Sequence, residues 1–88
     1  MASALGLDQE FRLARAMATW QRLVEERVPA AAGASEVLEI GHGVIVVAAD
    51  APIVAQELRL RGPELLDGFR TAPGGVPVRE LRVVVRRR

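Results

Sequence analysis

The sequence predicts an α+β fold with the order helix, strand, strand, helix, helix, strand, in which a three-stranded mixed sheet carries its helices on one face. Apolar residues first recur every three or four positions, then alternate along two stretches around a glycine-rich turn. They alternate again after two short segments that start with proline. A strand, a helical crossover and a further strand in one sheet are right-handed, which places the last strand parallel to the second. With 88 residues, 50% hydrophobic and 26% charged, we expect one globular domain over residues 1–88.

The first helix is predicted over residues 8–28. Its apolar stripe repeats at steps of four, three and four residues, through Leu13, Met17, Trp20 and Val24. Asp8 is suited to cap this helix, because its carboxylate can accept hydrogen bonds from the first backbone N–H groups. Pro29 ends the helix, and the segment "PAAAGA" that starts there is predicted to be a linker.

Residues 35–49 are predicted to form a hairpin. The stretch "SEVLEI" alternates, so that Leu38 and Ile40 face one side and Glu39 faces the other. The stretch "GHG" is predicted to be a tight turn, because glycine accepts positive φ at little cost. The β-branched run "VIVVAA" then predicts a central strand.

A second helix is expected to start at Asp50 and Pro52, since proline loses no hydrogen bond at the first helical position. Its apolar side is predicted to consist of Ile53, Val54 and Leu58. Gly62 is expected to end this helix in a left-handed conformation, and Pro63 to begin the next one.

The third helix is predicted to bury Leu65, Leu66 and Phe69. Gly68 lies inside it and costs about 1 kcal/mol relative to alanine, which predicts the least stable of the helices. The stretch "VRELRVVV" alternates again and predicts the last strand, with one apolar side formed by Leu81, Val83 and Val85.

The residues that usually carry catalysis or bind metals are scarce. The chain has no cysteine and no lysine, and its single histidine, His42, lies between two glycines in a predicted turn. We therefore expect no enzyme activity, no metal site and no cofactor. The first residues do not resemble a secretory signal and no apolar run approaches about 18 residues, so we expect a cytoplasmic protein without a membrane span.

Charge is divided unevenly along the chain. Residues 1–58 carry four arginines against eight acidic residues, whereas residues 59–88 carry eight arginines against three. This division indicates a basic region that could meet phosphates, although a solvated surface ending in a short basic tail, residues 86–88, explains it equally well. The candidate DNA-binding residues are Arg59, Arg61, Arg70, Arg79, Arg82, Arg86, Arg87 and Arg88.

Two levels of resemblance follow from these motifs. The element order, with a helix–glycine–helix junction, resembles the K-homology fold in its prokaryotic arrangement, although the junction "RLRGP" has one glycine in place of a G-x-x-G loop. The stretches "WQRLVEERVPAAA", "AQEL", "PELL" and "VRELR" also occur in the order and spacing of the DciA family, the bacterial replicative-helicase operators. The resemblance covers roughly residues 16–85.

The DciA resemblance implies a non-enzymatic replication factor. Members of that family bind the DnaB-type helicase and promote its loading onto single-stranded DNA. The candidate helicase-binding residues are then Trp20, which corresponds to the tryptophan of the family's first helix, and Arg59 and Arg61 beside the bend. From the residues alone, however, we favour an aromatic anchor at the edge of the core for Trp20, with partner contact as the alternative. The DNA affinity implied is weak, independent of sequence and salt-dependent, because aromatic residues for base stacking are few.

Two other functions fit the sequence. One is a general single-stranded RNA- or DNA-binding module of the K-homology type, and the other is a protein-interaction scaffold. For the bend at Gly62 and Pro63 we expect a charged contact from the neighbouring arginines, and no backbone cradle for phosphate, since proline removes one N–H group.

Overall fold

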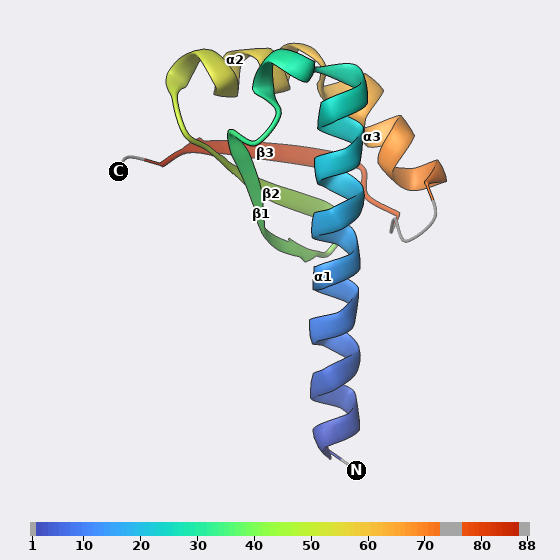
Figure 1. Cartoon of the computed structure of the whole chain (residues 1–88). Coiled ribbons are helices and arrows are strands. Elements are labelled where there is room, and N and C mark those ends of the chain that lie inside the picture. The colour runs from blue at the N-terminus through green and yellow to red at the C-terminus, as the bar shows by residue number, and fades with distance from the viewer. Residues whose placement is uncertain (1, 73–76, 87–88) are drawn as a thin grey trace.

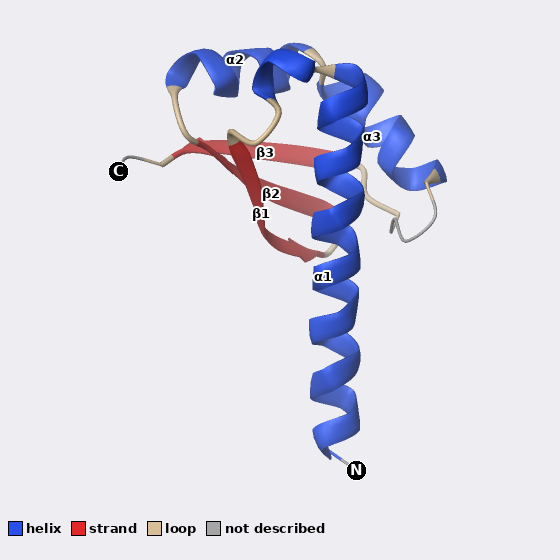
Figure 2. Ribbon diagram, in the orientation of Figure 1, coloured by secondary structure: helices blue, strands red, loops and turns tan. Residues whose placement is uncertain are grey.

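The elements of the fold occur in the predicted order. The computed structural model describes residues 2–72 and 77–86, with side chains described from Phe11 onward. The elements are α1 (Ala2–Arg27), a short 3-10 helix η1 (Pro29–Ala31), β1 (Ser35–Gly41), β2 (Val44–Ala49), α2 (Pro52–Leu60), α3 (Gly62–Thr71) and β3 (Glu80–Val85) (Figure 1, Figure 2). The α+β order α-β-β-α-α-β is therefore confirmed.

The three strands form one mixed sheet in the order β1-β2-β3. β1 pairs with β2 in the antiparallel sense, with Ile40 beside Ile45. β3 pairs with β2 in the parallel sense, with Leu81 beside the same Ile45. The long crossover through α2 and α3 permits this parallel pairing, as the prediction required.

The helices cover one face of the sheet. Alternate residues of β2, Ile45 and Val47, are fully buried in the same core as Trp20 of α1, Leu58 of α2 and Phe69 of α3. The intervening residues of β2 point to the opposite face, since successive side chains of a strand alternate. No helix among the described residues covers that second face (Figure 1).

Helix α1 is longer than predicted. It begins at Ala2, so Asp8 lies inside the helix and is not its N-cap, which corrects the predicted start. The added residues "ASALGL" include alanine and leucine, both strong helix formers, which favours a longer helix. This N-terminal part of α1 projects well beyond the sheet (Figure 1). No helix within the described residues is long and apolar enough to cross a membrane.

β1 contains a bulge that changes which side chains face the core. The register with β2 shifts between Val37 and Glu39, and Leu38 is the extra residue. Val37 and Ile40 therefore pack on the core, whereas Leu38 is 45% exposed. The prediction that Leu38 and Ile40 share one face was wrong, because simple alternation does not anticipate a bulge.

The turn between β1 and β2 is tight, as predicted, but its two positive φ angles belong to His42 (54°) and Gly43 (77°). Gly41 remains in the strand. Histidine is tolerated in the left-handed region more readily than most residues, so one glycine suffices for this hairpin.

The junction between α2 and α3 differs from the prediction in its backbone. Among the described residues only His42, Gly33 and Gly43 have positive φ, so Gly62 is not a left-handed cap. Arg61 makes the bend, with φ −94° and ψ 8°, and Gly62 is already the first residue of α3. α2 also buries Ala55 and Leu58, whereas Ile53 is 65% exposed, contrary to the predicted apolar side.

Candidate nucleic-acid and partner surfaces

Four of the candidate arginines lie along β3. Arg79 precedes the strand, Arg82 is within it, Arg86 follows it, and Arg59 reaches it from α2. We call these four residues the β3 arginine row. Arg61 and Arg70 lie apart from the row, near the two ends of α3, and Arg87 and Arg88 are outside the described residues.

Arg59 has a structural contact that the sequence did not reveal. Its Nη2 donates a hydrogen bond to the carbonyl oxygen of Val83, at 2.9 Å. Because β3 is an edge strand, this carbonyl has no neighbouring strand to bond. The residue remains exposed, but its guanidinium lies on the sheet edge rather than pointing freely into solvent.

Arg86 joins the ends of all three strands. Its Nη2 and Nε donate to Oδ1 of Asp50 at 2.9 and 3.1 Å, and its Nη1 lies 3.4 Å from Oε1 of Glu36. The hydrogen bond to Asp50 raises the pKa of Arg86 above its ordinary value. A basic group with a raised pKa in the folded protein stabilises the fold fully at every pH below the pKa that it has in the unfolded chain. Arg86 is therefore protonated near neutral pH, and the contact keeps its full contribution there.

Three other arginines form exposed ion pairs. They are Arg61 with Glu64 at 3.9 Å, Arg70 with Asp67 at 3.1 Å, and Arg82 with Glu80 at 2.8 Å. The hydrogen bond to Glu80 raises the pKa of Arg82. Exposed pairs contribute only about 0–1 kcal/mol, so a phosphate can replace the carboxylate at small cost.

Arg79 differs from Arg82 and Arg86, the two members of the row that form ion pairs. It has no ion pair within the described residues, and its side chain lies over Gly43, with Cγ 3.5 Å from the position a Cβ would occupy there. The residue is exposed. It is therefore the row's least neutralised charge.

Trp20 lies in the core. Its side chain has no exposed area, and its Nε1 donates a hydrogen bond to Oγ of Ser35, at 3.1 Å. The side chain of Gln21 donates to the backbone oxygen of the same serine, at 2.7 Å. These contacts attach α1 to the start of β1, which favours the core-anchor interpretation of Trp20 over direct contact with a partner.

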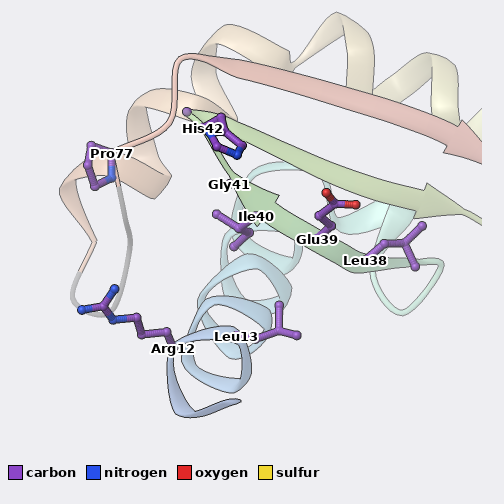
Figure 3. Close-up of a pocket in the computed structure, with 9 residues that line it drawn as sticks. Arg12, Leu13, Leu38, Glu39, Ile40, Gly41, His42 and Pro77 are labelled. Carbon is purple, nitrogen blue, oxygen red and sulfur yellow. The ribbon is translucent and has the colours of Figure 1, made fainter. Parts of the chain in front are cut away.

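A cleft of about 730 Å³ lies between the projecting part of α1 and the turn of the hairpin (Figure 3). It is lined by Arg12, Leu13, Leu38, Glu39, Ile40, Gly41, His42, Gly43 and Pro77. Leu13 and Leu38 face it from α1 and β1, and both are exposed. An apolar centre with charged residues at its margin is a common arrangement in protein interfaces.

The comparison with known families gives a match over nearly the whole chain. The family model described as "Dna[CI] antecedent, DciA" matches residues 1–83. The chain belongs to the DciA family. This family implies a role of the helicase-loader type in bacterial DNA replication. No curated protein matches the chain.

The DciA motifs occupy defined places in the structure. "AQEL" forms the middle of α2, "PELL" forms the first turn of α3, and "VRELR" leads into β3. Together they enclose the bend at Arg61 and the edge of β3. The bend offers no glycine-rich loop, because Gly62 is buried in α3 and Pro63 has no N–H group.

Sequence reasoning missed the cleft and the contacts of Arg59 and Arg86. A signal for the cleft was available in Leu13. This residue begins the predicted apolar stripe of the first helix, but it lies beyond the part of the helix that packs on the core, so its side chain stays exposed. The ion pairs join residues up to 50 positions apart, such as Arg86 and Glu36, and no local pattern encodes them.

Proposed function

We propose that this DciA-family protein is a non-enzymatic, cytoplasmic replication factor that binds the DnaB-type helicase and promotes its loading onto single-stranded DNA. The observation that carries the proposal is the family match, which extends over residues 1–83 and includes all of the helices and most of β3. The chemistry of the exposed surfaces supports it, because one group of residues suits phosphates and another suits a protein.

The β3 arginine row is the proposed DNA contact. Its members follow one strand for about 23 Å at roughly 3.3 Å per residue, a length that can accompany several nucleotides of an extended strand. Arginine contacts to phosphate carry no sequence information, so the binding is independent of sequence. The carboxylates that already pair with Arg82 and Arg86 keep it weak.

The cleft between α1 and the hairpin is the proposed helicase contact. It suits a helicase element that inserts an apolar side chain between Leu13 and Leu38 and presents a carboxylate to Arg12. Trp20 then acts as a positioning residue, because Leu13 lies seven residues earlier on the same side of α1. Arg59 and Arg61 are a second candidate contact, for an acidic helicase surface near the bend.

The test is a binding measurement between the purified chain and a DnaB-type helicase, with a loading assay on single-stranded DNA. We expect Leu38→Asp to weaken helicase binding at least tenfold, because it places a charge in the apolar centre of the cleft. Ile53→Asp is the matched control, since Ile53 is also an exposed apolar residue and lies on α2. It should bind as the wild type does.

Each outcome separates the proposal from its alternatives. A wild-type chain that binds DNA with salt dependence but never binds helicase is a general single-strand-binding module. One that binds helicase with no salt-dependent DNA affinity is an interaction scaffold. Helicase binding that is retained by Leu38→Asp and lost by Ile53→Asp assigns the contact to α2 in place of the cleft.

A further inference from the structure

The sheet face opposite the helices is apolar along its centre and charged at its edges. On β2, Ile45 and Val47 belong to the core, whereas Val44 and Val46 lie outside the core cluster and face the other way. β1 and β3 contribute charged residues to this side. We define the open face by its residues Glu39, Val44, Val46, Arg82 and Val84.

One row of the open face has opposite charges at its two ends. Glu39 on β1 pairs in register with Val46 on β2, and Val46 pairs with Arg82 on β3. Across the sheet, this row therefore has an acidic, an apolar and a basic residue in turn. Glu39 and Arg82 at its ends lie two strand spacings apart, which is about 10 Å. Glu39 is exposed and has no ion pair within the described residues, while Arg82 has only its exposed pair with Glu80.

We propose that the open face binds the open face of a second copy of this chain, about a two-fold axis parallel to β2. That axis places β1 of one copy over β3 of the other. Glu39 then faces Arg82 of the partner subunit, Arg82 faces Glu39 of the partner subunit, and Val46 meets its counterpart at the centre. Sheets that pack face to face are about 10 Å apart, a gap that glutamate and arginine side chains can bridge together.

The charges select this axis and this occupant. A two-fold axis perpendicular to the strands would place β1 over β1 and bring the Glu39 side chains of both copies together, which like charges oppose. A nucleic acid laid across the whole face, and not only along β3 at its edge, would meet the carboxylate of Glu39 on β1. The self-complementary row favours a second copy, because a two-fold interface presents the same surface twice.

The size of the face predicts a weak dimer. Three strands of about six residues give a face of roughly 20 by 14 Å. The area of this face is well below the ~800 Å² that each partner contributes to a standard interface. The end of the face beside Ala48 is already covered, because the Arg86 side chain crosses it to reach Glu36. We therefore expect association only at high protein concentration, and weaker association as salt is raised.

Sedimentation of the 88-residue chain up to about 1 mM protein tests the proposal. Wild type should show reversible dimerisation at low salt. Glu39→Arg alone and Arg82→Glu alone should each weaken it about tenfold or more, and Val46→Asp should abolish it. An equimolar mixture of the two charge variants should associate again, since each supplies the charge that the other lacks. The double variant Glu39→Arg/Arg82→Glu should also self-associate.

Arg70→Glu is the control, because Arg70 lies on α3, away from the open face. It should dimerise like the wild type, and circular dichroism should show every variant folded. The proposal is wrong if the wild type remains monomeric throughout, if Glu39→Arg dimerises unchanged, or if the double variant does not recover. If the mixture associates but the double variant does not, the two-fold axis is instead perpendicular to the strands.

Discussion

At the scale of single residues, Gly68 sets how closely α1 approaches α3. A Cβ built at this glycine would lie only 2.9 Å from Cδ2 of Leu23, which is closer than real Cβ contacts allow. Leu23 is 6% exposed and belongs to the same core cluster as Phe69 and Trp20, which limits its room to move. The glycine that sequence reasoning treated as a weak point of α3 is thus the residue that permits the helix packing.

We expect Gly68→Ala to lower the free energy of unfolding by about 1 kcal/mol. Alanine gains about 1 kcal/mol of helix propensity, but overpacking in a filled core costs about 1–3 kcal/mol. Urea unfolding measures the difference. Gly62→Ala is the control, because a Cβ there meets only Cδ2 of Leu81, at 3.9 Å, and should cost nothing. Equal effects at both glycines would refute this account.

At the scale of elements, β3 is an edge strand that is only partly protected. Its neighbour is β2 on one side, and on the other side Arg59 occupies the carbonyl of Val83. Val84 and Val85 at the end of the strand are exposed. Exposed strand edges pair readily with other chains, so an arginine that engages the edge also limits unwanted association.

We expect Arg59→Ala to lower the free energy of unfolding by about 1 kcal/mol, the usual contribution of one hydrogen bond. Arg70→Ala should change it by less than about 0.5 kcal/mol, since it removes only an exposed ion pair. Chemical denaturation of both variants checks the difference. If Arg70→Ala proves the more costly, the Val83 contact has no stabilising role. Any loss of DNA or helicase binding in Arg59→Ala must be measured under conditions where the variant is fully folded.

At the scale of the whole molecule, several arginines of the basic segment, residues 59–88, form a row along one strand. The net charge is only +1, so the position of the arginines matters more than their sum. Carboxylates neutralise Arg82 and Arg86 in part, and this leaves Arg79 and Arg59 as the charges of the row without an acidic partner within the described residues.

We expect affinity for single-stranded DNA to fall steeply as salt rises. Arg79→Ala should weaken binding at low salt and reduce the slope of log affinity against log salt by about one, because it removes one phosphate contact. Arg70→Ala, outside the row, should leave both nearly unchanged. Fluorescence anisotropy with two unrelated oligonucleotides measures this. Affinity that stays constant from low to high salt, or that depends strongly on base sequence, would contradict a phosphate-only contact.

The sequence by itself determined the order of the elements, the sense of both strand pairings and the family. These depend on local periods, on proline and glycine positions and on the handedness of crossovers, all of which a single chain shows directly. The sequence also predicted apolar positions of the helices that are fully buried in the structure, namely Trp20, Leu58, Leu65 and Phe69.

Only the tertiary structure decided which residues are free to act. The bulge at Leu38 turned a predicted core side chain outward, and the approach of α2 to the sheet edge gave Arg59 a backbone partner. Arg86 found carboxylates 36 and 50 positions away. Each of these outcomes depends on which groups meet across the fold. The period of a regular segment predicts the face on which a side chain lies, but a bulge can change that face, and the partner a side chain finds is set by the packing of distant elements.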